Sequence, residues 1–207
     1  MSVFPFGMEG ALTKAQVRSE LAAYEGQLAD AWHGAWNEWM SLPAESRAKI
    51  GPMQRGGVVH DFAVDRATGF FPGDQGATTW VCRDGFWKLY VNDKIVIRLK
   101  KLRADGSIPL GGKSEATRRY YKNSSLPNVR NHCHRLSAGY LLNAVETEIE
   151  EVRIVYQLND QVIWSYSIDE GGIQTQFHET PGDSDTPPPQ PNVTLAEDDD
   201  QNAAAEG

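Results

Sequence analysis

The chain has 207 residues, of which 40% are hydrophobic, and it carries a formal net charge of -8. It contains no apolar run near the roughly 18 residues of a membrane span, and its first residues lack the basic and apolar regions of a signal peptide. Its 2 cysteines are too few for a secreted disulfide framework. We therefore expect a cytoplasmic protein with reduced thiols and no membrane contact.

Charge is sorted along the chain. All 20 lysines and arginines lie at or before Arg153, whereas Asp169 to Gly207 hold ten acidic residues and no basic one. Residues 1–168 therefore carry 20 bases against 28 − 10 = 18 acids, a charge of +2. A nearly neutral body with an acidic tail favours binding and regulation over catalysis.

The front of the chain predicts helices. Thr13 and Gln16 have the spacing of a capping box, and an apolar stripe from Val17 to Trp39 predicts one long helix after it. Trp32 and Trp36 lie on this stripe with Trp39, and we expect the three rings to pack in the core. Residues 43–50 predict a second, short helix. The glycine-rich residues 51–76 predict a loop with one uncertain element at 58–64.

The middle of the chain predicts a sheet. Strands are expected at 78–83, 86–91, 94–99, 139–142, 149–158 and 162–168, with a short helix at 114–121. Alternation in the third strand predicts one solvated face. The fold class is therefore α+β, with a long N-terminal helix packed on a mostly antiparallel sheet. We expect one domain at 1–168, helical at 11–50 and sheet-rich at 78–168, followed by a disordered, acidic, proline-rich tail at 169–207.

A basic stretch gives the strongest functional signal. Between Arg98 and Arg135 there are ten basic residues and two acidic ones, which would attract phosphate or an acidic partner. Two tyrosines within it could stack on bases. An ordinary solvated face is the alternative. The candidate contact residues for nucleic acid or a partner are Arg98, Lys100, Lys101, Arg103, Arg118, Arg119, Tyr120, Tyr121 and Lys122.

Catalytic and metal signals are weaker. His60, Asp61 and Asp65 form the best titratable cluster of the front half, but a metal-dependent nuclease needs converging carboxylates and usually a nearby lysine. These three are weak catalytic candidates, and whether the protein is an enzyme stays open. The run from Asn131 to His134 contains two histidines and a cysteine, yet its spacing fits no standard zinc motif. We expect no metal site and no cofactor.

Residues 86–168 resemble a family of small uncharacterised bacterial proteins. The shared motifs are Lys88-Leu-Tyr-Val91, Val96-Ile-Arg-Leu-Lys-Lys-Leu102, Ala138-Gly-Tyr-Leu-Leu-Asn-Ala144, Thr147-Glu-Ile-Glu-Glu-Val152 and Val162-Ile-Trp164. The resemblance implies a gene neighbour that joins a helix-turn-helix domain to an ImmA/IrrE-type peptidase domain. It also implies membership of a toxin–antitoxin or prophage-regulatory pair. The loop at 103–127 departs from the family pattern, and the acidic tail is additional.

These observations predict a component of a bacterial toxin–antitoxin or phage-defence module. It would bind a protein partner through Arg98–Lys122, with nucleic acid as a further candidate ligand and the acidic tail competing in cis. One alternative is a toxin enzyme that acts on nucleic acid. The other is a structural or immunity protein that makes no contact with nucleic acid.

Overall fold

The computed structural model describes residues 12–72, 74–75, 77–83, 86–110 and 114–169. The chain divides into two units, Met1–Gly172 and Ile173–Gly207, and the second lies outside the described residues. Of the tail predicted to be disordered, residues 170–207 lie outside them too, whereas the Asp169 carboxylate accepts from Val152 N at 2.7 Å. The helices are α1 (Lys14–Leu21), α2 (Glu25–Ser41), α3 (Ala44–Ala48), α4 (Pro52–Phe70) and α5 (Glu115–Tyr121). The strands are β1 (Asp74–Gln75), β2 (Thr78–Arg83), β3 (Phe86–Val91), β4 (Ile95–Lys101), β5 (His134–Leu142), β6 (Ile149–Leu158) and β7 (Gln161–Ser167).

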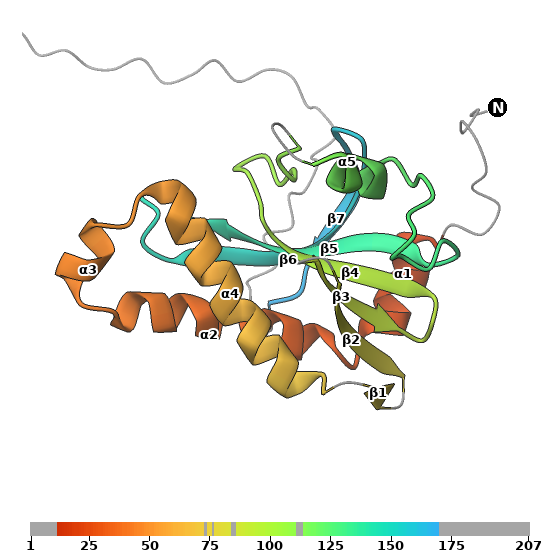
Figure 1. Ribbon diagram of the computed structural model, residues 1–207, viewed down its shortest axis with the longest axis horizontal. Helices are drawn as coiled ribbons and strands as arrows, with labels where there is room; N and C mark the ends of the chain where they lie inside the picture. Colours follow the sequence, from red (N-terminus) through yellow and green to blue (C-terminus); the bar gives the residue numbers. More distant parts are fainter. Residues whose placement is uncertain (1–11, 73, 76, 84–85, 111–113, 170–207) are drawn as a thin grey trace, which may run out of the picture. The chain divides into compact units, whose positions relative to one another are not determined.

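The strands form one seven-stranded sheet in sequence order, β1 to β7. Every neighbouring pair is antiparallel except β4 and β5, which are parallel and joined by the segment that contains α5 (Figure 1). A parallel pair needs a crossover connection, and α5 supplies it. The predicted α+β class and mostly antiparallel sheet are confirmed.

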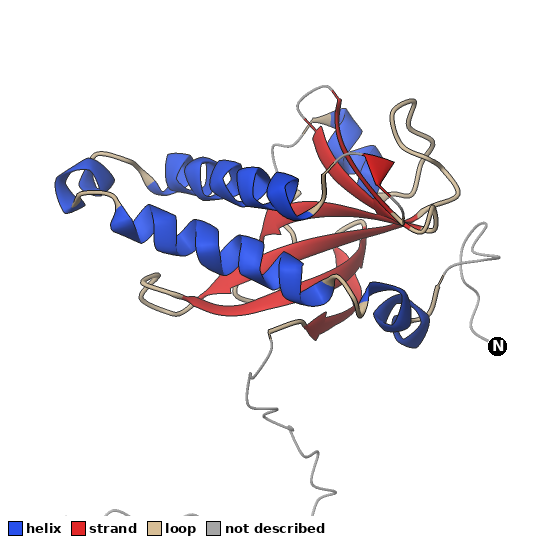
Figure 2. Ribbon diagram, turned by 90° about the horizontal axis from the view of Figure 1, so that it is seen from below, coloured by secondary structure: helices blue, strands red, loops and turns tan. Residues whose placement is uncertain are grey.

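Helices α2 and α4 lie side by side across one face of the sheet (Figure 2). Trp32 is fully buried there, and Trp36 and Trp39 are each 4% exposed, so the three rings belong to the core as predicted. The Trp32 ring packs on Tyr140 of β5 at a centroid distance of 4.6 Å. Its Nε1 donates to the Ala138 carbonyl at 3.3 Å, which satisfies the indole N–H.

The predicted long N-terminal helix is divided in two. Thr13 forms the expected capping box with Gln16, but α1 ends at Leu21 and α2 begins at Glu25. The break lets α1 lie beside the end of the sheet, where the Lys14 Nζ donates to the Ser165 carbonyl of β7 at 2.8 Å. The apolar stripe continues through the break, so the sequence pattern alone does not reveal it.

The loop prediction for residues 51–76 was wrong, because α4 spans 19 of them. Pro52 begins the helix at a position where its missing N–H costs nothing, and Val59, Ala63 and Ala67 are fully buried against the core. An added Cβ at Gly56, Gly57 or Gly69 would meet nothing within 4 Å. These glycines lie on the open side of the helix, and packing of the other side offsets their low helix propensity.

The opposite face of the sheet is also covered, which contradicts the predicted solvated face of β4. Val96 is fully buried in a second cluster that includes Leu102, Ile108 and Tyr120, and Arg98 is 5% exposed. Helix α5 and the segments around it supply this cover. Within the described part of the chain, no helix combines the length and apolar character needed to cross a membrane.

Two of the sequence motifs pack directly on each other. Lys100 pairs with Gly139 in the parallel β4–β5 ladder, and Leu102 N donates to the Tyr140 carbonyl at 3.0 Å. A Cβ on Gly139 would lie 2.6 Å from the Leu102 side chain and 2.8 Å from the Lys100 carbonyl oxygen. The glycine of the Ala-Gly-Tyr motif therefore makes room for the leucine of the Lys-Lys-Leu motif.

Candidate nucleic-acid and partner interface

The fold divides the basic stretch into buried and exposed groups. Arg98 and Arg135 are 5% and 4% exposed, and Tyr120 and Tyr121 are 2% and 3% exposed. The exposed cations of the stretch, among the described residues, are Arg103, Arg118, Arg119, Lys122 and Arg130. The ten bases do not form one continuous surface.

The two tyrosines cannot stack on bases as predicted, because helix α5 turns both rings into the protein. The Tyr120 hydroxyl lies 3.0 Å from the carbonyl oxygens of Val96 and Leu136, to which it donates. The Tyr121 hydroxyl is 2.9 Å from the Ser137 Oγ. Burial raises the pKa of both hydroxyls. The rings fasten α5 to the centre of the sheet instead.

Arg135 on β5 holds the C-terminal end of α5. Its Nη1 donates to the carbonyls of Arg119, Tyr120 and Ser124 at 3.2, 3.2 and 2.9 Å. A cation that binds the last carbonyls of a helix satisfies acceptors without intrahelical partners and complements the helix dipole. The guanidinium carbons of Arg98 and Arg135 lie 5.1 and 5.5 Å from the Tyr120 ring centroid. The predicted contact residue Arg98 is thus a buried support of this helix.

The outer side of α5 carries the exposed charge. The helix begins at the Ser114 cap, whose Oγ accepts from Thr117 N at 3.3 Å. Arg118 and Lys122 are four residues apart and therefore neighbours on the helix surface, with Arg119 beside them. Arg119 Nη2 also donates to the Ser125 carbonyl at 2.6 Å, which holds that side chain near the helix end.

Lys100 and Lys101 point to opposite faces of the sheet, as strand alternation predicts. Lys100 pairs with Gly139, and Lys101 pairs with Tyr140, which contacts the tryptophans under α2. The Lys101 Nζ forms an ion pair with Glu146 at 3.1 Å. Lys100 and Lys101 at the end of β4 therefore lie in two different environments and do not belong to one surface.

The weak catalytic candidates all lie on α4 and do not converge. Asp61 and Asp65 are exposed, whereas His60 is half-buried, with its Nδ1 3.4 Å from the Asp61 Oδ1. Burial lowers the pKa of His60; the Asp61 hydrogen bond opposes this shift, and the charge of Lys100 adds to it. Helix α4 thus places His60 close enough to Lys100 for the lysine charge to affect its pKa. The two residues are 40 positions apart, and the sequence alone does not indicate that they are neighbours.

One group of three metal-binding donors occurs in the described residues, at Asp93, His132 and Cys133, with donor atoms within 4.8 Å of one another. The Asp93 carboxylate already pairs with Arg130 at 2.6 Å and with His132 at 3.2 Å. Cys133 Sγ donates to the Asp93 carbonyl at 3.4 Å, and burial raises the pKa of this thiol to about 11. These contacts join the β3–β4 turn to the segment before β5.

His134, the last residue of the run from Asn131 to His134, is not part of this group. Its ring is 8% exposed and 4.5 Å from the Tyr156 ring centroid. Burial lowers its pKa to about 4. The other cysteine, Cys82, is exposed on β2.

No known protein family, curated protein or solved structure matches this chain.

Proposed function

We propose that this protein is the binding component of a bacterial toxin–antitoxin or phage-defence module and acts in the cytoplasm. Its ligand is an acidic surface of a protein partner, and nucleic acid is a weaker second ligand. Arg118, Arg119 and Lys122 on α5 make the contact. The family resemblance at 86–168 supports a partner with helix-turn-helix and ImmA/IrrE-type domains.

One observation carries this proposal: α5 is fastened from below while its outer cations stay exposed. Tyr120, Tyr121 and Arg135 bind the helix to the sheet through hydrogen bonds of 2.9 to 3.2 Å. Cations on a fixed element lose less conformational freedom on binding than cations on a free loop. The buried tyrosines thus favour α5 as a binding surface over α5 as an ordinary solvated helix.

The geometry also limits nucleic-acid binding to the phosphate backbone. With both tyrosine rings buried, base stacking contributes nothing on α5, and sequence would not be distinguished there. Three phosphate contacts predict a slope of about -3 for log K against log salt on duplex DNA. A measured slope near zero would remove nucleic acid as a ligand of this surface.

The acidic tail should weaken binding to any polyanion. Removing residues 170–207 deletes nine acids and no base, which changes the net charge from -8 to -8 + 9 = +1. We expect the chain that ends at Asp169 to bind DNA more tightly than the full chain at low salt, because long-range repulsion is removed. Equal affinities would contradict a role of the tail as a competitor.

Growth of a bacterial host that expresses the full chain tests the proposal. A binding component leaves growth unimpaired and co-purifies with the helix-turn-helix partner encoded beside it. Arrest that is abolished by Ala substitution of His60, Asp61 and Asp65 would instead support the toxin enzyme. Unimpaired growth with no co-purified partner and no DNA binding would support the structural or immunity role.

A further inference from the structure

A groove opens where β4 ends and the β5–β6 connection turns. It has a volume of about 460 Å³. Its walls include Lys101, Leu102, Arg103, Pro109, Leu141 and Glu146. Apolar side chains thus form much of the lining, and two cations stand at it.

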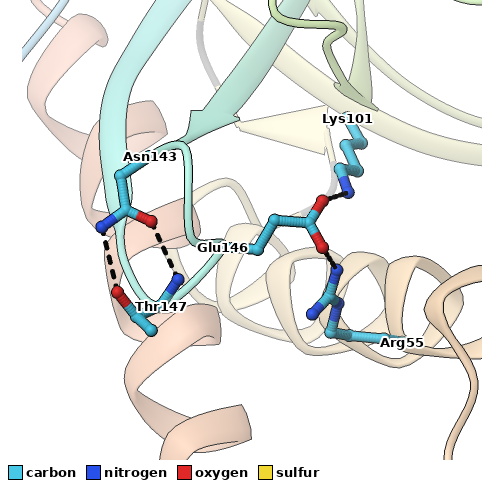
Figure 3. A network of polar contacts seen from close by, with 5 residues as sticks. All are labelled: Arg55, Lys101, Asn143, Glu146 and Thr147. Atoms are coloured by element: carbon cyan, nitrogen blue, oxygen red, sulfur yellow. Dashed lines mark hydrogen bonds and ion pairs between the residues drawn. The ribbon is translucent and has the colours of Figure 1, made fainter.

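Glu146 lines this groove. Its carboxylate lies between the side chains of Lys101 and Arg55 (Figure 3). Its Oε1 pairs with Lys101 Nζ at 3.1 Å, and its Oε2 pairs with Arg55 Nη2 of α4. Arg55 and Lys101 come from different elements, and one carboxylate bridges them. These cations lower the pKa of Glu146, which keeps it ionised.

The turn that presents Glu146 is held in an unusual backbone conformation. Glu146 has φ of 54°, in the left-handed region that residues with a side chain seldom adopt. Asn143 fixes the turn, because its Oδ1 accepts from Thr147 N at 2.9 Å and its Nδ2 donates to Thr147 Oγ1 at 3.0 Å (Figure 3). Trp36 Nε1 donates to the Thr147 carbonyl at 3.0 Å. The carboxylate is therefore delivered by a built turn.

The charges at the groove leave a positive surplus. Of the lining residues, Lys101 and the exposed Arg103 contribute +2 against -1 from Glu146, and Arg55, which pairs with Glu146 from α4, adds one more cation beside the groove. The side chain of Arg55 is 17% exposed and that of Glu146 is 46% exposed, so the acid is the member of this pair that can swing into solvent. Glu146 thus holds the position, between Lys101 and Arg55, that the carboxylate of another molecule would take.

We propose that this groove binds a short acidic segment of a protein partner, with a carboxylate that displaces Glu146 from Lys101 and Arg55. A neighbouring apolar side chain of that segment enters between Leu102, Pro109 and Leu141. Nucleic acid fits less well, because a phosphate backbone offers no apolar group for these walls. This proposal rests on the proposed function as a binding component. It adds to the α5 surface a second binding site, which Glu146 occupies in the free protein.

Fluorescence anisotropy with the full chain tests the assignment. The probe is a fluorescein-labelled, C-terminally amidated peptide of alternating leucine and glutamate. Glu146→Gln should raise its affinity about threefold to tenfold, because the internal competitor is neutralised. Glu150→Gln is the matched control, since it removes the same charge from an exposed acid of β6, and it should leave the affinity unchanged. Lys101→Gln should lower it.

The α5 surface is controlled separately. The gain from Glu146→Gln should persist in a chain that also carries Arg118→Glu and Lys122→Glu. If the peptide affinity is unchanged by Glu146→Gln but falls with the two α5 substitutions, the groove is not the binding site, whereas the proposed function still holds. A gain for a twelve-nucleotide single strand in place of the peptide would overturn the acidic-peptide assignment. Loss of the gain in the α5 background would also contradict a separate site.

Discussion

The two faces of the sheet are both buried, yet they are closed by different chemistry. Under α2 and α4 the cover is apolar and aromatic, centred on Trp32, Trp36 and Tyr140. Under α5 the buried set includes Lys88, Arg98, Arg135, Ser137 and Gln157 beside the tyrosines. The first face is held by area removed from water, whereas the second combines an apolar cluster with hydrogen bonds of buried polar groups.

This difference explains why a count of charges misleads. A lysine or arginine in sequence suggests surface, and ten of them in one stretch suggest a patch. In the structure Arg135 uses its charge to bind the carbonyls at the end of α5, and Arg98 lies over the Tyr120 ring. The cations that remain outside are fewer, and the buried ones hold them in place.

The apolar face should give the largest loss of stability. Trp32→Ala removes a fully buried ring and the contact with Tyr140, so we expect the free energy of unfolding to fall by about 3 to 5 kcal/mol. Urea denaturation measures it. Met53→Ala, at a side chain 89% exposed, is the control and should change little. A loss below about 1 kcal/mol for Trp32→Ala would mean that this face is not the main core.

The polar face should respond to a single lost donor set. Arg135→Met keeps an unbranched apolar stem but removes the donor that the Arg119, Tyr120 and Ser124 carbonyls share, so the first two keep only their backbone donors. We expect a loss of about 2 to 4 kcal/mol, with faster amide exchange in α5 than in α2. Arg119→Met, which removes one exposed hydrogen bond, should cost less than about 1 kcal/mol. Equal effects would contradict the supporting role of Arg135.

His134 should make stability depend on pH. Burial lowers its pKa from 6.5 to about 4, so the unfolded chain takes up the proton first as pH falls. Its contribution is complete above pH 6.5 and is lost as pH falls toward 4, by roughly 3 kcal/mol at most.

His134→Phe keeps an aromatic ring beside Tyr156. In this variant the free energy of unfolding should depend less on pH between 6.5 and about 4. The lowered pKa of His60 acts in the same direction. The pKa of His33 is raised, chiefly by its hydrogen bond to Asp169, and its contribution is lost as pH rises. Because the variant retains both histidines, the difference between the two curves isolates His134. Parallel curves would mean that His134 is not desolvated.

The exposed cations of α5 should matter least for stability. Arg118→Glu with Lys122→Glu places two acids near the helix C-terminus, which costs less than about 1 kcal/mol each. Thermal unfolding by circular dichroism checks this. A large loss would show that these side chains support the fold.

Sequence patterns predicted elements where one physical rule decides the outcome. β2, β3 and β6 begin and end as expected, and the Thr13 capping box is present. Each of these features is local, so the sequence contains its cause.

Predictions failed where distant packing decides. Helix α4 was missed because its glycines are compensated by burial of Val59 and Ala63 against α2 and the sheet. The inward direction of Tyr120 and Tyr121 depends on carbonyl and hydroxyl groups of β4 and β5. The bridge from Arg55 and Lys101 to Glu146 joins residues 45 and 91 positions apart, and no spacing rule connects them.

The central claim is that the outer cations of α5, and not the net charge of the chain, bind the partner. The direct measurement compares two double variants of equal charge by titration calorimetry with the proposed helix-turn-helix partner. One carries Arg118→Glu and Lys122→Glu, and the other carries Arg18→Glu and Lys49→Glu at exposed sites outside α5. We predict that the first loses at least about tenfold in affinity while the second stays within about twofold of the unaltered chain. Equal losses in the two variants would contradict the account.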